Sequence, residues 1–154
     1  MLHLVLYQPE IPPNTGNIIR LCANTRTALH LVEPLGFDWD DKRLRRAGLD
    51  YREFADVSRH ASLDALVLAL GQPRIFGLST RGTRNYTDAS FRDGDALMFG
   101  PETRGLPDPV LEDLGPEGCL RIPMQADSRS LNLSNAAALV LYEALRQLDF
   151  PGLH

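Results

Sequence analysis

Short apolar runs alternate along this chain with longer segments whose apolar residues recur at helical spacing. A run of about five apolar residues, bounded by polar or turn-forming residues, is typical of a strand buried on both faces of a parallel sheet. Five runs fit this description and predict strands at Leu2–Tyr7, Ala28–Val32, Arg74–Leu78, Ala96–Phe99 and Cys119–Ile122.

The segments between these runs predict helices. Asn14 or Thr15 is a candidate cap for a helix that runs to about Arg26, and Leu133–Leu148 places its apolar residues on one helical face. Shorter helices are expected at Ser62–Leu70, at Asp108–Gly115, and over the basic segment DDKRLRRAG, which opens at Asp40 or Asp41 and ends at Gly48.

Strands that alternate with helices favour an α/β fold, with a mostly parallel sheet flanked by helices on both faces. The loops that follow four of the strands are polar and rich in Gly or Pro. They are Gln8–Asn17, Ser79–Arg84, Gly100–Pro107 and Pro123–Asn132. Ligands of open parallel sheets bind beyond the carboxyl ends of the strands, so these loops are expected to converge on one site.

The last strand and the last helix are joined by an unusually polar elbow. Its polar side chains are Asp127, Ser128, Arg129, Ser130, Asn132 and Asn135. Such a loop can be a solvated connection that contains a helix cap, because Ser and Asn are favoured caps. The coincidence of four polar loops at one edge of the sheet favours a functional site.

Composition and charge restrict the possible domain organisation, partners and location of the protein, but they do not indicate a function. The 154 residues, 44% apolar and 23% charged, fit one soluble domain spanning 1–154. The net charge of −4 means that any nucleic-acid site must be a local basic patch. Cys22 and Cys119 have no metal-ligand or redox spacing, which indicates reduced core thiols in a cytosolic protein. With no basic leader or membrane span in the sequence, a cytoplasmic location is expected.

Several standard chemistries lack their sequence signals. The chain has no GxxxxGK[ST] or GxGxxG phosphate loop and no GxSxG nucleophile elbow, and its four histidines are scattered singly, so no metal site is expected. A paired-carboxylate mechanism would require Glu10 and Glu102 to face each other. The loops instead offer backbone amides, hydroxyls, side-chain amides and arginines, a set suited to a polar cofactor and an anionic substrate.

Three separated motifs carry a family resemblance. They are NTGNIIR at 14–20, FGPETRGLP at 99–107, and IPM with SRSLNLSN at 122–124 and 128–135. In order and spacing they resemble the motifs of the knotted SPOUT class of S-adenosylmethionine-dependent RNA methyltransferases, most closely its TrmL (YibK-like) subgroup. The segments LYQPEIPPNTGN and DDKRLRRAGLDY also resemble that subgroup, whereas 55–72 and 85–93 match nothing.

The resemblance implies a fold that periodicity does not predict, namely a C-terminal trefoil knot in which the last strand and helix thread a loop. It implies a cofactor pocket for S-adenosyl-L-methionine, with main-chain groups and side chains of the motifs around it. The cofactor-binding residues implied in this way are Leu78, Gly100, Ile122, Met124, Ser130, Leu131, Thr80 and Gly82.

The implied reaction is methylation of the ribose 2′-hydroxyl of the wobble nucleotide, a cytidine or modified uridine at position 34 of tRNA, with leucine tRNAs as expected substrates. Arg20 matches the motif arginine assigned to activate the hydroxyl, and Asn14, Glu102 and Asn132 match other polar site positions. A guanidinium stays protonated under ordinary conditions, so Arg20 can instead orient the ribose or neutralise a phosphate. Local alternatives are helix caps for Asn14 and Asn132 and a turn carboxylate for Glu102.

The resemblance also bears on partners. At 154 residues no separate RNA-binding extension is expected, so tRNA is expected to bind the catalytic domain. The resemblance also implies a homodimer through the C-terminal helix, including Tyr142. The basic residues expected to contact RNA are Lys42, Arg43, Arg45, Arg46, Arg84 and Arg129, with Arg81 and Arg104 as further candidates. Two rival functions stay open: methylation of another tRNA or rRNA ribose, and a non-catalytic α/β module that binds a small anionic metabolite.

Overall fold

The computed structural model describes residues 1–40, 42 and 56–154. Within them a seven-stranded sheet has the order β3-β2-β1-β6-β4-β7-β5, and every pair of neighbouring strands in it is parallel. The strands are β1 (His3–Tyr7), β2 (Ala28–Val32), β3 (Val57–His60), β4 (Ile75–Leu78), β5 (Arg84–Asn85), β6 (Ala96–Phe99) and β7 (Cys119–Arg121).

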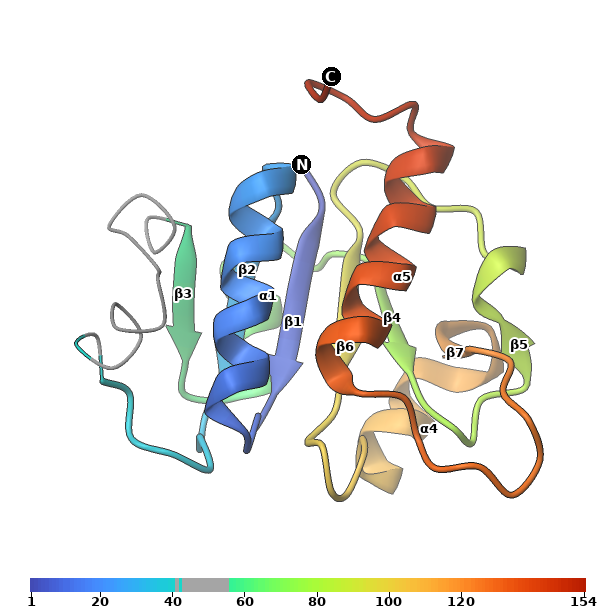
Figure 1. Cartoon of the computed structure of the whole chain (residues 1–154), viewed down its shortest axis with the longest axis horizontal. Coiled ribbons are helices and arrows are strands. Elements are labelled where there is room, and N and C mark those ends of the chain that lie inside the picture. Colours follow the sequence, from blue (N-terminus) through green and yellow to red (C-terminus); the bar gives the residue numbers. More distant parts are fainter. Residues whose placement is uncertain (41, 43–55) are drawn as a thin grey trace.

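Helices cover both faces of this sheet. They are α1 (Pro12–Thr25), α3 (Leu63–Ala69), α4 (Asp108–Gly118) and α5 (Leu133–Gln147), together with the 3₁₀ turn η1 (Tyr86–Asp88). Figure 1 shows α1 and α5 side by side in front of the sheet, with α4 behind it. The prediction of an α/β fold with a parallel sheet flanked by helices is confirmed.

Two apolar layers hold the helices to the sheet. On the α1 and α5 side, alternate strand residues such as Leu4 and Leu6 pack against Ile18 of α1 and Val140 of α5. On the other side, the intervening residues such as Val5 pack with Leu66 of α3 and with apolar residues of α4. The central strands are therefore buried on both faces, which explains their nearly continuous apolar runs.

The structure also corrects the expected elements. The first long helix begins at Pro12 after the N-cap Ile11, so Asn14 and Thr15 are not its cap; two prolines open the helix, where their missing N–H groups cost nothing. Gly115 does not end α4 but forms a kink in it, with φ 71° and ψ 175°. The strands β3 and β5 were not predicted. Apart from Asp40 and Lys42, the helix expected over DDKRLRRAG lies outside the described residues.

Candidate functional site

A cavity of about 480 Å³ opens beyond the carboxyl ends of β4, β6 and β7. All four polar loops contribute to its wall, which contains both apolar and polar side chains. In Figure 1 the loops after β1, β6 and β7 lie at the same lower edge of the sheet. The lining residues include Ile11, Asn14, Leu78, Ser79, Thr80, Arg81, Phe99, Gly100, Glu102, Thr103, Arg104, Ile122, Met124, Ser130, Leu131 and Asn132.

The loop after β6 folds sharply back on itself at Gly100. A Cβ atom at this position would lie 2.4 Å from the backbone N of Leu106 and 2.5 Å from the carbonyl C of Gly105. Only glycine permits so close an approach, and the loop therefore keeps the shape that forms one wall of the cavity.

The loop after β4 is held by neighbouring backbone. Gly82 donates its N–H to the carbonyl of Ser79 at 3.1 Å, and a Cβ atom on Gly82 would lie 2.7 Å from the carbonyl oxygen of Leu120. Gly82 is buried and does not line the cavity, although it was expected among the cofactor contacts. Its close approach to β7 supplies the physical reason for a glycine there.

Two glutamates join the loop after β1 to the loop after β6. The carboxylate of Glu102 accepts the backbone N–H groups of Glu10 at 2.9 Å and Ile11 at 2.5 Å. In return, the carboxylate of Glu10 accepts the backbone N–H of Thr103 at 2.9 Å and its hydroxyl at 2.7 Å. The two carboxylates therefore bind opposite loops, rather than facing each other across a substrate.

Hydrogen bonds from Thr103, first from its backbone N–H and then from its hydroxyl, lower the pKa of Glu10. The nearby Arg104 guanidinium, 3.8 Å from the Glu10 carboxylate, acts in the same direction. Because this pKa is depressed, the charged form that makes these contacts is present at neutral pH and is lost only as the pH falls into the acid range.

Asn132 connects the last helix to the first. Its side-chain oxygen accepts the N–H groups of Ser134 at 2.9 Å and Asn135 at 3.3 Å, so it caps α5. Its amide nitrogen donates to the side-chain oxygen of Asn14 at 3.1 Å. Both side chains line the cavity, and Asn14 is otherwise buried. Asn132 therefore caps α5 and also holds the Asn14 side chain at the cavity wall.

The structure brings most of the expected site residues together. Among the expected cofactor contacts, all but Gly82 line the cavity: Leu78, Gly100, Ile122, Met124, Ser130, Leu131 and Thr80. Asn14, Glu102 and Asn132 line it as well. Arg20 does not; it lies exposed on α1, outside the cavity of the single chain.

The expected RNA contacts are more dispersed. Lys42 and Arg129 are exposed, whereas the guanidinium of Arg84 donates to the carbonyls of Glu117 at 2.9 Å and Asp88 at 3.2 Å. Arg43, Arg45 and Arg46 lie outside the described residues. The further candidates Arg81 and Arg104 both line the cavity, and Arg81 also pairs with Asp108 and donates to the Leu106 carbonyl.

Sequence reasoning missed several lining residues. Ile11, Ser79, Phe99 and Thr103 were not singled out, although each stands beside a residue that was. Thr103 lies within the FGPETRGLP motif. If every residue of that motif had been assigned to the cavity wall, Thr103 would have been predicted.

Residues 1–142 match the SpoU rRNA Methylase family. This chain belongs to the SpoU rRNA Methylase family. The match covers every loop of the cavity, and it confirms the resemblance drawn from the three motifs.

Relatives of this SpoU-family chain are similar over nearly its whole length. The tRNA (cytidine(34)-2'-O)-methyltransferase of Escherichia coli (strain K12) is 62% identical over 152 residues, which cover 99% of this chain and 97% of the relative. A solved structure concerned with 2-OH methylation of C/U34 on tRNA is 49% identical, with a TM-score of 0.88 over 97% of each chain.

A more distant structure contains a ligand. The SpoU methyltransferase AviRb from Streptomyces viridochromogenes, solved in complex with AdoMet, is 26% identical, with a TM-score of 0.82. The similarity covers 97% of this SpoU-family chain and 58% of AviRb.

Across residues 1–40, 42 and 56–154, no three His, Cys, Asp or Glu side chains are grouped so that they could hold a metal ion. None of the helices in that part of the chain combines the length and apolar character needed to cross a bilayer.

Proposed function

We propose that this SpoU-family chain transfers a methyl group from S-adenosyl-L-methionine to the ribose 2′-hydroxyl of the nucleotide at wobble position 34 of tRNA. The observation that carries the proposal is the cavity, to which all three motifs contribute lining residues, in a chain 62% identical to a tRNA (cytidine(34)-2'-O)-methyltransferase over 99% of its length. The target nucleotide is a cytidine or a modified uridine, and leucine tRNAs are the expected substrates.

The cavity fits this cofactor in size and in chemistry. Its volume of about 480 Å³ falls within the range of roughly 300–1,000 Å³ found for small-ligand sites. Leu78, Phe99 and Ile122 supply an apolar slot for an adenine ring, and the backbone of the loop after β6 supplies polar groups beside it. The Arg81 and Arg104 guanidinium groups suit a carboxylate.

Bound S-adenosylmethionine supplies an activated methyl group, so the protein has to align the ribose and manage one proton. Asn14, held by Asn132 and largely buried, offers a fixed amide at the cavity wall for orienting a hydroxyl. Ser130, Leu131, Thr80 and Met124 line the same cavity. Glu102 is placed at the entrance of α1.

Arg20 is proposed to activate the 2′-hydroxyl, or to orient the ribose or neutralise a phosphate next to it. Because Arg20 lies outside the cavity of the single chain, this role requires that bound RNA or a second copy of the chain complete the site. The guanidinium keeps its charge at physiological pH, which favours contact with a phosphate or a developing alkoxide.

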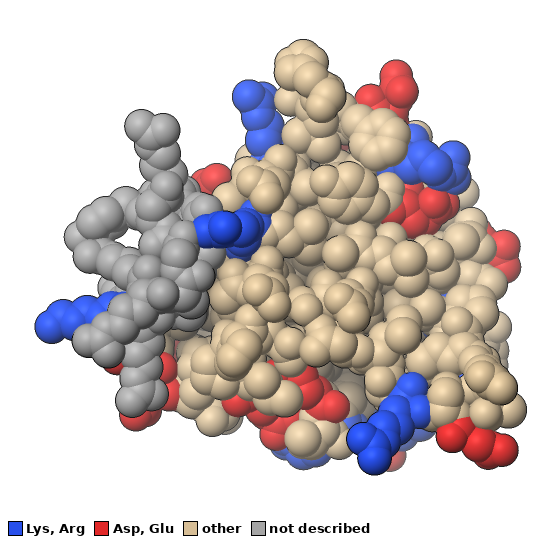
Figure 2. Space-filling view, viewed as in Figure 1, with Lys and Arg blue, Asp and Glu red and all other residues tan. Residues whose placement is uncertain are grey.

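A homodimer through α5 is part of the proposal. Leu139 and Tyr142 are 42% and 47% exposed on that helix. Figure 2 shows that the centre of the face formed by α1 and α5 carries few charged side chains, while Lys, Arg, Asp and Glu lie mainly around it. Such a surface suits a self-complementary contact, because the core of an interface is depleted in charge.

The finer features of the fold are proposals of the same kind. We infer one methyltransferase domain over 1–154, with a trefoil knot made by the segments around β7 and α5, and a cytoplasmic location. The knot is supported by the SPOUT resemblance and by the two segments that it would hold together, 100–105 and 122–132, both of which contribute to the cavity.

Two measurements test the proposed function. Calorimetry should show that the protein binds S-adenosylmethionine, and labelled cofactor should transfer its methyl group to an unmodified tRNA. Arg20→Ala should keep cofactor binding but lose turnover, whereas Arg92→Ala, which removes an exposed arginine far from the cavity, should keep both. Absence of cofactor binding would favour a metabolite-binding module, and labelling of rRNA alone would favour a different ribose.

A further inference from the structure

The reciprocal contact between Glu10 and Glu102 has no role in the chemistry proposed above. Both oxygens of Glu102 already accept backbone N–H groups, from Glu10 and Ile11. Both oxygens of Glu10 lie within 3.0 Å of the Thr103 hydroxyl, and one also accepts the Thr103 N–H. Neither carboxylate is placed to take a proton from a substrate without giving up these bonds.

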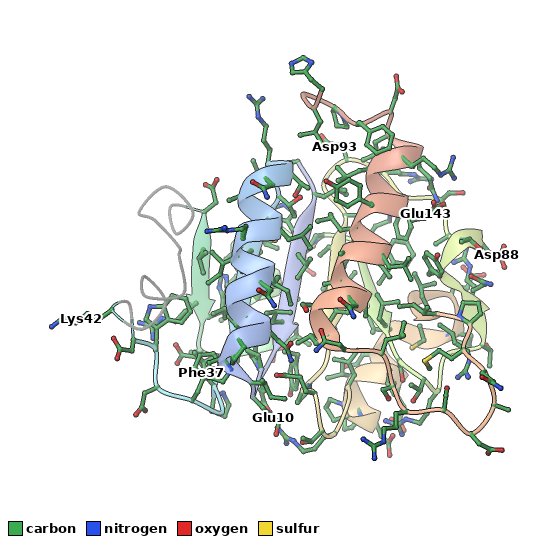
Figure 3. The ribbon with its side chains drawn as sticks, viewed as in Figure 1. Glu10, Phe37, Lys42, Asp88, Asp93 and Glu143 are labelled. Carbon is green, nitrogen blue, oxygen red and sulfur yellow. The ribbon has the colours of Figure 1, made fainter. Side chains whose placement is uncertain are left out.

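These bonds join two segments that are more than ninety residues apart in sequence, with separations of 91 to 93 residues. One segment leads into α1, which carries Asn14 and Arg20. The other is the sharply turned loop that contributes Gly100, Glu102 and Thr103 to the cavity wall. Figure 3 shows Glu10 at the end of the molecule where α1 begins, next to the loop after β6.

Neighbouring groups hold Glu102 at the start of α1 and confine the backbone of Glu10. The α1 N-cap, Ile11, makes no side-chain cap hydrogen bond, and Glu102 instead places its carboxylate at this helix start, where the helix dipole favours a negative charge. Glu10 is also confined from the other side, because a Cβ atom on Gly36 would lie 3.0 Å from the Glu10 Cα. The Gly36 N–H donates to the Pro9 carbonyl at 2.9 Å.

We propose that Glu10 is a positioning residue for methyl transfer: with Glu102 and Thr103 it forms a latch that sets the cofactor-binding loop after β6 against the start of α1. The latch rests on the proposed function, since it aligns the two walls between which cofactor and ribose would meet. Glu102 then acts by holding the α1 entrance, not by contact with the ribose.

A set of variants tests the latch. Glu10→Ala removes every acceptor for Thr103. Glu10→Gln keeps an acceptor for the Thr103 N–H and hydroxyl and adds a donor. Thr103→Val removes the hydroxyl and keeps the N–H. Glu112→Ala is the matched control, because it removes an exposed carboxylate on α4 that does not line the cavity.

Glu10→Ala should weaken S-adenosylmethionine binding and lower kcat/KM for tRNA, each by about tenfold or more, as expected for loss of hydrogen bonds to a charged group. Glu10→Gln should stay within about threefold of the wild-type protein, because a neutral hydrogen bond keeps part of the interaction. The double variant Glu10→Ala/Thr103→Val should be no worse than Glu10→Ala, since both changes break one contact.

Two kinetic results would overturn the latch. One is Glu10→Ala with wild-type cofactor affinity and turnover. The other is Glu10→Gln as impaired as Glu10→Ala, which would assign Glu10 a chemical role as a charged group rather than a positional one. Additive losses in the double variant would equally contradict a shared contact between Glu10 and Thr103.

Hydrogen–deuterium exchange separates failure of the latch from failure of the proposed function. In the protein without ligand, Glu10→Ala should speed exchange of the Thr103 amide and of neighbouring amides in 100–106, and Glu112→Ala should not. Unchanged exchange would refute the latch even in an active enzyme. Faster exchange in a protein that binds no S-adenosylmethionine would leave the latch standing and refute the methyltransferase proposal.

Discussion

A row of three histidines across β1, β2 and β3 predicts that acid destabilises this protein. His3 Nδ1 lies 3.0 Å from His30 Nε2, and His30 Nδ1 lies 3.0 Å from His60 Nε2. His30 is 5% exposed. In a neutral row each bond has one donor and one acceptor, so protonation of the central ring removes an acceptor that a neighbour needs.

Burial is the main cause that lowers the pKa of His30 to about 4, with smaller contributions from His3 and His60. Burial also lowers the pKa values of both neighbours; for His3 the N-terminal charge adds to this, and Asp93 opposes it. The unfolded chain therefore binds more protons between about pH 6.5 and pH 4, and stability falls as the pH falls through this window.

The shift of His30 from 6.5 to about 4 corresponds to a loss of about 3 kcal/mol in the free energy of unfolding, at about 1.4 kcal/mol per pH unit. The loss is absent above pH 6.5 and is nearly complete at pH 4.

The assay is urea unfolding at a series of pH values and at one fixed protein concentration, because a dimer would make stability depend on concentration. His30→Gln keeps a donor and an acceptor in the row but does not titrate, so it should lose about 3 kcal/mol less than wild type between pH 6.5 and pH 4. His154→Gln, at the exposed C-terminus, serves as the control. If the free energy of unfolding fell equally with pH in the wild-type and His30→Gln proteins, titration of His30 would not be the cause of the acid destabilisation.

Two further substitutions test parts of the site. Gly100→Ala places a Cβ atom 2.4 Å from the Leu106 backbone N, so the loop has to shift, and calorimetry should show S-adenosylmethionine affinity reduced by about tenfold or more; wild-type affinity would mean that the loop does not shape the pocket. Asn132→Ala removes both the α5 cap and the Asn14 contact and should cost about 1 kcal/mol in thermal or urea unfolding. Asn132→Asp should recover the cap but not the amide donation to Asn14, so recovered stability with full activity would contradict a role for that contact.

Local patterns predicted the central part of the fold. β2 and β6 have the predicted bounds, and β1, β4 and β7 differ from them by one residue at one end. The reason is that these strands are largely buried on both faces and read as nearly continuous apolar runs. The edge strands lack that signal: Val57–His60 has one apolar residue, and Arg84–Asn85 has none. Their place in the sheet comes from pairing with distant residues.

The convergence of the four loops was predictable from the parallel sheet, and the motifs located most of the wall. The detailed contacts were not predictable, because they join segments far apart in sequence. Glu10 and Glu102 were considered as a facing pair, whereas each binds the backbone of the other loop. Gly82 follows the pattern of a ligand loop, yet its small size serves the approach to Leu120. The sequence pattern is the same whether a glycine contacts a ligand or permits close approach of two backbone segments.

The position of the transferred methyl group is the strictest test of methylation at the wobble ribose. An unmodified leucine tRNA is incubated with the protein and S-adenosylmethionine, digested to fragments and nucleosides, and analysed by mass spectrometry. We expect one added methyl group, on the ribose of nucleotide 34, and none in a reaction that contains the Arg20→Ala variant. A methyl group on a base, or on the ribose of any other nucleotide, would contradict it.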